Sequence, residues 1–198
     1  MTTNHLDIGC GSRPRNPYNR DVLWGLDINE KAASENSHIK VCNVAIEKIP
    51  FEDDFFDSVS AYDFIEHLPR ALINDGQTRY PFVELMDEIW RVLKPRGLLY
   101  AVTPAYPRQE AFVDPTHTNV ITAKTHEYFT SPHYLARIYG FEGHFVARRV
   151  QWVRRMQDYE ICNPSLWKRI KRYKYFLQKK MTHLMWEFEK IPSQTRTI

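Results

Sequence analysis

The stretch Leu6-Asp7-Ile8-Gly9-Cys10-Gly11-Ser12 decides the fold of this chain. A short apolar strand runs directly into a glycine-rich turn, and the two glycines have no Cβ that would keep a ligand away from the backbone. A second apolar run, 22–27, ends in Asp27, sixteen residues after Gly11. At about this distance a second-strand carboxylate accepts hydrogen bonds from ribose hydroxyls, so we expect an adenosine-containing ligand. The alternatives are an ordinary tight turn at the glycines and helix capping by Asp27.

The residues around the turn distinguish two classes of adenosine cofactor. A dinucleotide site needs a third glycine and a helix whose N-terminus holds the diphosphate. Pro14 takes the place of that glycine and Pro17 follows it, so we expect no helix there. Asp7 would repel a phosphate, but it suits an ammonium group. These features favour S-adenosylmethionine over NAD.

Five further segments follow in an order that resembles a class I S-adenosylmethionine-dependent methyltransferase, and the likeness covers residues 4–105. They are the second strand with its ribose acid (23–28), the adenine-edge stretch (42–44), the run into the fourth strand (49–59), the segment after that strand (63–68), and the helix, turn and fifth strand (88–99). The resemblance implies a Rossmann-like α/β methyltransferase fold. This fold has a mostly parallel seven-stranded sheet, an antiparallel C-terminal hairpin and helices on both faces.

The resemblance also implies S-adenosyl-L-methionine as cofactor and a set of cofactor-binding residues. The implied residues are Asp7, Gly9, Gly11, Asp27, Ile28, Asn43, Val44, Asp63 and Phe64. Asn43 stands where the family usually has an aspartate, and its carbonyl can still accept from the adenine amino group. The alternatives are an ordinary loop asparagine at position 43 and a helix cap at Asp63.

Apolar patterning extends this organisation along the chain. It predicts strands at 5–8, 22–27, 39–41, 56–62 and 98–103 and a helix at 79–93. Toward the C-terminus it predicts a helix at 131–139, antiparallel strands at 145–153 and 158–162, and a helix at 165–189. We therefore expect a methyltransferase domain at 1–163. The remainder, 164–198, is expected to form a basic amphipathic helix that packs on the same domain.

The segment 104–130 is rich in proline and polar residues, and we expect it to form the acceptor pocket over the carboxyl ends of the strands. Within it, His117 is the candidate base that takes a proton from an acceptor hydroxyl, with Asp114 as its orienting partner or as a substrate ligand. The alternative is that His117 only fixes the loop. The adjacent pair Glu66 and His67 is interpreted as structural.

A metal site formed by Asp114 and histidines 117, 126 and 133 lacks a recognised ligand spacing, so no metal is expected.

Composition sets the remaining limits. The chain has 198 residues, of which 43% are hydrophobic, enough for one domain with a real core. The N-terminus lacks the pattern of a signal peptide, and no run has the apolar length of a membrane span. Three widely spaced cysteines favour a reducing, cytoplasmic location.

The strongest charge asymmetry is at 168–180, which holds seven Lys or Arg residues and no acid. A solvated helix face is the ordinary meaning of such a run. The other interpretations are an anionic membrane surface or lipid-linked glycan, and nucleic acid, for which no recognised motif is found. A homodimer through the apolar stripe is a further option.

The leading hypothesis is in-line methyl transfer to a hydroxyl of a sugar, a glycan or another small molecule. Arg13-Pro14 after the turn resembles small methyltransferases of glycan and polysaccharide biosynthesis. One alternative is a non-catalytic cofactor-binding or regulatory protein, because the family's helices before the first strand have no counterpart ahead of residue 5. A second is an RNA methyltransferase that uses the basic helix.

Overall fold

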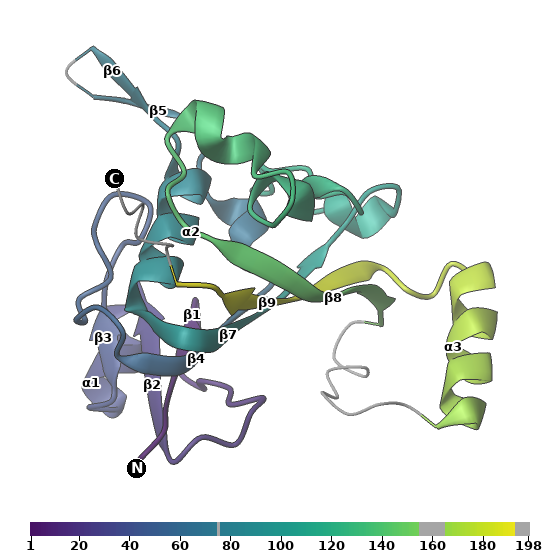
Figure 1. Cartoon of the computed structure of the whole chain (residues 1–198), viewed down its shortest axis with the longest axis horizontal. Helices are drawn as coiled ribbons and strands as arrows, with labels where there is room; N and C mark the ends of the chain where they lie inside the picture. The colour runs from purple at the N-terminus through teal and green to yellow at the C-terminus, as the bar shows by residue number, and fades with distance from the viewer. Residues whose placement is uncertain (75, 155–164, 193–198) are drawn as a thin grey trace.

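The structure, a computed structural model, describes residues 1–74, 76–154 and 165–192. Its centre is a seven-stranded sheet with the strand order β3-β2-β1-β4-β7-β9-β8 (Figure 1). In that order, the strands are Ile39–Val41, Val22–Asp27, Asn4–Ile8, Phe56–Tyr62, Leu93–Pro104, His183–Lys190 and Phe145–Val153. A separate hairpin pairs β5 (Leu72–Asn74) with β6 (Gln77–Arg79).

The directions of the strands agree with the predicted fold class. The first five strands in this order, β3, β2, β1, β4 and β7, run parallel. Strand β9 is antiparallel to both β7 and β8. The strands predicted at 22–27, 39–41 and 56–62 are confirmed residue for residue. Parallel strands place their carboxyl ends at one edge of the sheet, so the turn after β1 and the acid that ends β2 lie at the same edge.

The predicted C-terminal helix is wrong in its second half. Helix α3 spans Leu166–Leu177 only, and the chain then enters β9. All eight residues of β9 are buried between β7 and β8, and a strand buried on both sides has no alternation to separate it from a helix. The strand predicted at 158–162 lies outside the described residues, and the antiparallel partner of β8 is β9.

Helix α2 (Pro81–Val92) covers the sheet with the face that its sequence spacing predicts. Leu85, Met86 and Ile89 are buried in the main core, and Pro81 begins the helix at a position where its missing N–H costs nothing. The short helix α1 (Glu30–Glu35) follows β2. Residues 12–21 form turns and extended chain, so the segment after the glycine turn is not helical, as expected.

The segments after β7 are mostly loops and short 3₁₀ turns. The turns are η2 (Gln109–Ala111), η3 (Thr125–Tyr128) and η4 (Leu135–Tyr139), and η1 (Ile65–His67) follows β4. The helix predicted at 131–139 is therefore reduced to η4. It ends at Gly140, whose φ of 92° is readily adopted only by glycine.

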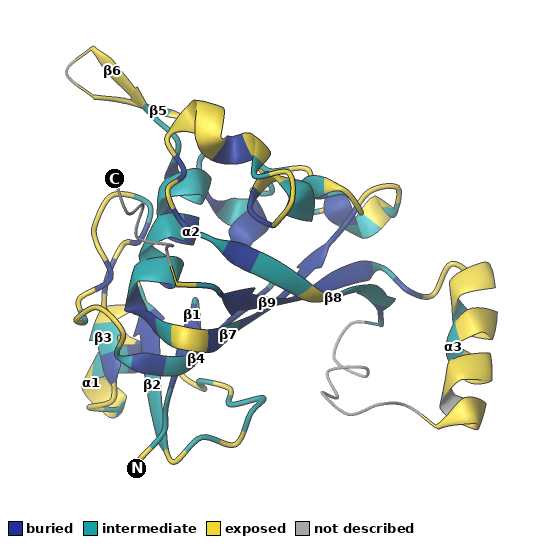
Figure 2. Cartoon of the chain, in the orientation of Figure 1, coloured by how far each residue is buried: buried dark blue, intermediate teal, exposed yellow. Residues whose placement is uncertain are grey.

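Helix α3 stands beside the β8 end of the sheet and is mostly exposed (Figures 1 and 2). It contacts the body where Arg172 donates to the Trp152 carbonyl and where the ring of Phe176 meets that of Trp152. Across the ranges that the structure describes, no helix combines the length and apolar character needed to cross a membrane.

Candidate functional site

The glycine turn and the acid of β2 meet, as the sequence predicts. Gly9 and Gly11 have φ angles of 67° and 56°, in the region that glycine tolerates best. The Gly9 and Cys10 N–H groups donate to the Leu26 carbonyl, which ties the turn to the end of β2. Asp27 accepts from Gly11 N at 2.7 Å through Oδ2 and from Asn29 N at 2.9 Å through Oδ1. The carboxylate is therefore held in place at the turn.

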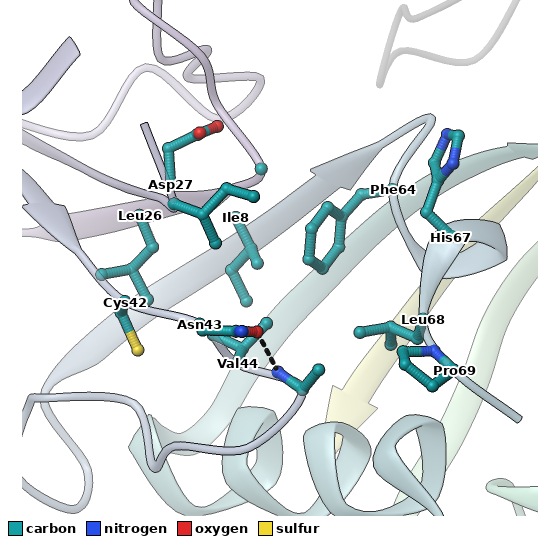
Figure 3. Close-up of a pocket in the computed structure, with 13 residues that line it drawn as sticks. Ile8, Leu26, Asp27, Cys42, Asn43, Val44, Phe64, His67, Leu68 and Pro69 are labelled. Carbon is teal, nitrogen blue, oxygen red and sulfur yellow. Dashed lines mark hydrogen bonds between the residues drawn. The ribbon is translucent and has the colours of Figure 1, made fainter. Parts of the chain in front are cut away.

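A cavity of about 430 Å³ opens beside this turn (Figure 3). Its walls come from the ends of β1 and β2, from the loop after β3, and from the segment after β4. The lining residues are Ile8, Gly9, Leu26, Asp27, Ile28, Cys42, Asn43, Val44, Ala45, Phe64, His67, Leu68 and Pro69. The walls are mainly apolar with a few polar groups, as is usual for small-molecule sites.

Six of the nine predicted cofactor-binding residues line this cavity together. They are Gly9, Asp27, Ile28, Asn43, Val44 and Phe64. The side chain of Asn43 accepts from Ala45 N at 3.2 Å, which fixes the loop and leaves a second lone pair on the same oxygen (Figure 3). Gly11 lies next to Asp27, and a Cβ built on it has no atom within 4 Å, so space for a ligand is open at the turn.

Asp7 does not line the cavity. It is buried beneath the turn, where it accepts from Arg15 N at 2.8 Å and from the Ser60 hydroxyl at 2.6 Å. Burial raises the pKa of the Asp7 carboxyl to about 6. Its position indicates support of the loop 12–15 from behind rather than contact with an ammonium group.

Asp63 also lies outside the cavity wall. Its Oδ1 is 3.1 Å from Nε2 of His183, the buried first residue of β9. The backbone of Asp63 adopts a φ of 48°, and its N–H donates to the Val102 carbonyl. The residue thereby links the ends of β4, β7 and β9.

The structure rearranges the predicted catalytic pair. His117 Nδ1 lies 3.2 Å from the Ala111 carbonyl, and His117 Nε2 lies 4.0 Å from Glu66 Oε1. Asp114 accepts from the N–H and hydroxyl of Thr116, at 2.8 and 2.6 Å. The expectation that Asp114 orients His117 is therefore wrong, because the group that contacts His117 Nδ1 is a carbonyl.

The residue that the sequence interpretation missed is His67. It lines the cavity, and its ring meets that of His117 edge to face at 4.7 Å between centroids. His67 Nδ1 lies 2.8 Å from the hydroxyl of Thr116, which connects it to Asp114. The adjacent Glu66-His67 pair was the available signal. In the sequence alone, a Glu-His pair near a helix start is typical of a satisfied hydrogen-bond pair, and His117 lies fifty residues further along the chain.

The hydrogen bonds and exposure of these residues fit binding of S-adenosylmethionine. The Asp27 carboxylate keeps lone pairs for ribose hydroxyls beside its two backbone bonds. The apolar side chains of Ile28 and Val44 flank the space next to Asn43. Ile28 is 70% exposed in the chain as it stands, which suits a side chain that packs on a planar base.

The structure has a second cavity, of about 650 Å³, and some of its lining residues come directly after those of the first cavity in the sequence. Leu68 and Pro69 line the first cavity, and Arg70 and Ala71 line the second. Five aromatic side chains line the second cavity: Tyr80, Phe82, Tyr128, Phe129 and Tyr139. Part of its wall, 119–129, belongs to the segment predicted to form the acceptor pocket.

Comparisons with known proteins agree with the fold. The family model described as "Methyltransferase domain" matches residues 6–101. Among curated proteins, no sequence matches significantly.

Solved structures with a similar fold include the methyltransferase in a complex with the Trm112 methyltransferase activator of Haloferax volcanii. That match has 13% identity and a TM-score of 0.60, and it covers 96% of this chain and 84% of the other. A SAM-dependent methyltransferase from Archaeoglobus fulgidus has 15% identity, coverage of 96% and 86%, and a TM-score of 0.56. The geranyl diphosphate C-methyltransferase of Streptomyces coelicolor, solved with S-adenosyl-L-homocysteine, has 12% identity, coverage of 96% and 74%, and a TM-score of 0.55.

Proposed function

Because residues 6–101 belong to the methyltransferase domain family and the chain is a class I S-adenosylmethionine-dependent methyltransferase, we propose that it methylates a hydroxyl group of a sugar, a glycan or another small molecule. The observation that carries the proposal is that consecutive residues line two cavities, with 68–69 in the wall of the first and 70–71 in the wall of the second. The first has the Asp27 carboxylate at the glycine turn, and the second has aromatic walls that suit the apolar faces of a small acceptor.

In this proposal the chain's own residues bind, orient and exclude water. Asp27 accepts from the ribose hydroxyls, and Ile28, Asn43 and Val44 flank the base. Phe64 and Leu68 close the cavity on the side of η1 and keep water from the reacting groups. When bound, the cofactor supplies a methyl group that its positively charged sulfur has already activated. His67, at the rim of the cavity (Figure 3), meets the acceptor hydroxyl, and the ring of His117 lies against the ring of His67.

Calorimetry with S-adenosylhomocysteine tests the cofactor half of the proposal, and transfer of a labelled methyl group to sugars, glycans and phenols tests the acceptor half. We expect binding of one molecule per chain and label on an acceptor oxygen. Binding without transfer to any acceptor class would favour a non-catalytic protein. Label on RNA instead of small hydroxyl compounds would replace the acceptor proposal with an RNA methyltransferase.

We further propose that α3 brings the enzyme to an anionic membrane surface, where lipid-linked acceptors are found. Its exposed apolar residues include Leu166, Trp167, Ile170, Tyr173 and Leu177. Exposed Arg169, Lys171 and Lys174 lie between them, and the first turn has no acid. Helices with aromatic and aliphatic residues on one side and Lys or Arg on the other lie in the interface of anionic bilayers.

A further inference from the structure

Three side chains with metal-binding atoms converge at the rim of the cofactor cavity. Glu66 and His67 come from η1, and His117 comes from the loop after β7. One ligand atom from each lies within 4.8 Å of the others, and Glu66 Oε1 is 4.0 Å from His117 Nε2. Two imidazoles and one carboxylate are a donor set that binds divalent transition metals.

Each of the two histidines uses Nδ1 in a hydrogen bond, which leaves Nε2 available to a metal ion. The Ala111 carbonyl can only accept, so His117 carries its proton on Nδ1 and keeps a lone pair on Nε2. The hydroxyl of Thr116 donates its proton to Asp114, so it accepts from Nδ1 of His67. His67 therefore also keeps its lone pair on Nε2.

This arrangement is the one found behind metal-ligating histidines, whose second nitrogen donates to a carbonyl, or to a group that a carboxylate holds. Asp114 is well suited to end such a series of hydrogen bonds, because its hydrogen bonds from Thr116 lower the pKa of its carboxyl and keep it ionised. The role of Asp114 is thus to position Thr116 and, through it, His67.

Glu66 completes the cluster from inside the protein. Its side chain is 1% exposed, and Oε2 accepts from the Thr103 hydroxyl at 2.9 Å. The Glu66 carbonyl accepts from the N–H groups of Thr118 and Asn119, which holds the loop of His117 against η1. Positive charge stabilises a buried carboxylate, so a cation between Glu66 and the two histidines would be favoured at this position.

We propose that Glu66, His67 and His117 bind one divalent transition-metal ion, of the zinc or manganese class, at the edge of the cofactor cavity. In a zinc site with bonds of about 2.0–2.1 Å the ligand atoms are about 3.3 Å apart, so the three side chains move together by about 1 Å when the ion binds. The remaining coordination positions take oxygen atoms of the acceptor.

The role of the ion in catalysis rests on the proposed function. A hydroxyl that the cation coordinates has a lowered pKa and releases its proton to solvent. Its oxygen then forms the bond to the methyl carbon, and the departing sulfur keeps the electron pair of the broken bond. The substrate class that this site selects is therefore an alcohol or phenol able to coordinate a cation.

Titration calorimetry of the chelator-treated full chain with ZnCl₂ and with MnCl₂ tests the site, with Co²⁺ absorption as a readout of the ligand field. We expect one ion per chain. His67→Asn and His117→Gln should each weaken binding at least tenfold, and Asp114→Asn, which disturbs only the chain behind His67, about tenfold. His126→Asn is the matched control, because His126 Nδ1 also contacts a backbone carbonyl, that of Ala123, outside the cluster.

Circular dichroism and urea denaturation without metal show whether each variant is folded. Absence of saturable metal binding, or equal affinity in the wild type and both ligand variants, overturns the site. If the wild type binds S-adenosylhomocysteine but no metal, the metal site fails and the methyltransferase proposal stands. If it binds metal but no S-adenosylhomocysteine, the metal site stands and the proposed function fails.

Discussion

The ring of Phe64 occupies the space into which a side chain on Gly9 would project. A Cβ built on Gly9 lies 2.3 Å from Cδ2 of Phe64, closer than any real contact. The missing side chain at the turn after β1 is therefore what lets the segment after β4 close the cofactor cavity. Phe64 forms one wall of that cavity (Figure 3), and Gly9 is also one of its lining residues.

Replacing Gly9 by alanine should destabilise the fold and the cavity together. Strain at a φ of 67° costs about 1–2 kcal/mol, and displacement of a well-packed ring costs about 1–3 kcal/mol. We expect Gly9→Ala to lower the free energy of unfolding by about 2–5 kcal/mol in urea denaturation. A loss no larger than the backbone-strain cost of about 1–2 kcal/mol would show that Phe64 has room to move.

Gly11→Ala separates backbone strain from loss of ligand space. Gly11 has a similar positive φ of 56°, but a Cβ there meets no atom of the chain within 4 Å. The unfolding free energy of the Gly11→Ala variant should fall by only about 1–2 kcal/mol. The added methyl group would project into the space beside Asp27, so we expect affinity for S-adenosylhomocysteine to fall at least tenfold. Wild-type affinity in this variant would place the ligand elsewhere.

Asp27→Asn tests the carboxylate at the end of β2. A hydrogen bond to a charged acceptor contributes about 1.5–3 kcal/mol, so we expect the dissociation constant for S-adenosylhomocysteine to rise about 10- to 100-fold in calorimetry. Asp21→Asn is the control, since Asp21 also accepts from a backbone N–H, that of Thr3, at the opposite end of β2. Equal losses in the two variants would contradict a role for Asp27 in binding.

Much of the cofactor half was predictable, because its signals are local. The apolar runs before Gly9 and Asp27 each form a parallel strand, and parallel strands of one sheet end at one edge. The turn, the acid and Asn43 are each placed by the strand that precedes them. The burial of Asp7 and its hydrogen bond from Ser60 of a neighbouring strand could not be predicted, because sequence spacing does not show them.

The C-terminal third was predicted less well, because tertiary contacts decide its structure. The charges of β9 resemble the polar side of a helix in the sequence, but each has a distant partner in the fold. Glu187 pairs with Arg149, and Lys190 lies 2.6 Å from Asp54. The same limit applies to His67 and His117, which become neighbours only through the fold.

The pH dependence of stability should reveal two buried groups that act in opposite directions. Burial lowers the pKa of His5 from 6.5 to about 3 and raises that of Asp7 from 3.8 to about 6. The stability contributed by neutral His5 is lost as pH falls through this range. The stability contributed by protonated Asp7 is lost as pH rises from about 4 to 6, so the two trends oppose each other there.

Asp7→Asn removes the second trend and keeps the size of the side chain. The unfolding free energy of this variant should therefore gain on the wild type as pH rises from 4 to 6, by up to about 1.4 kcal/mol per pH unit. Urea denaturation at four pH values measures the difference. In Asp21→Asn the lowered pKa of Asp21 predicts no such gain. A difference between Asp7→Asn and the wild type that is constant with pH would show that Asp7 titrates normally.

Substitution on α3 should release the enzyme from anionic membranes without affecting its cofactor site. Ile170 is 54% exposed on the helix, and burying such a side chain in a bilayer interface contributes about 1.5–3 kcal/mol. We expect Ile170→Ser to reduce binding to vesicles containing phosphatidylglycerol about tenfold, with S-adenosylhomocysteine affinity unchanged. Ile138→Ser is the matched control, because Ile138 is 79% exposed on η4. Wild-type binding that persists on neutral vesicles or in high salt would remove the electrostatic part of the proposal, and equal binding of both variants would remove α3 as the contact surface.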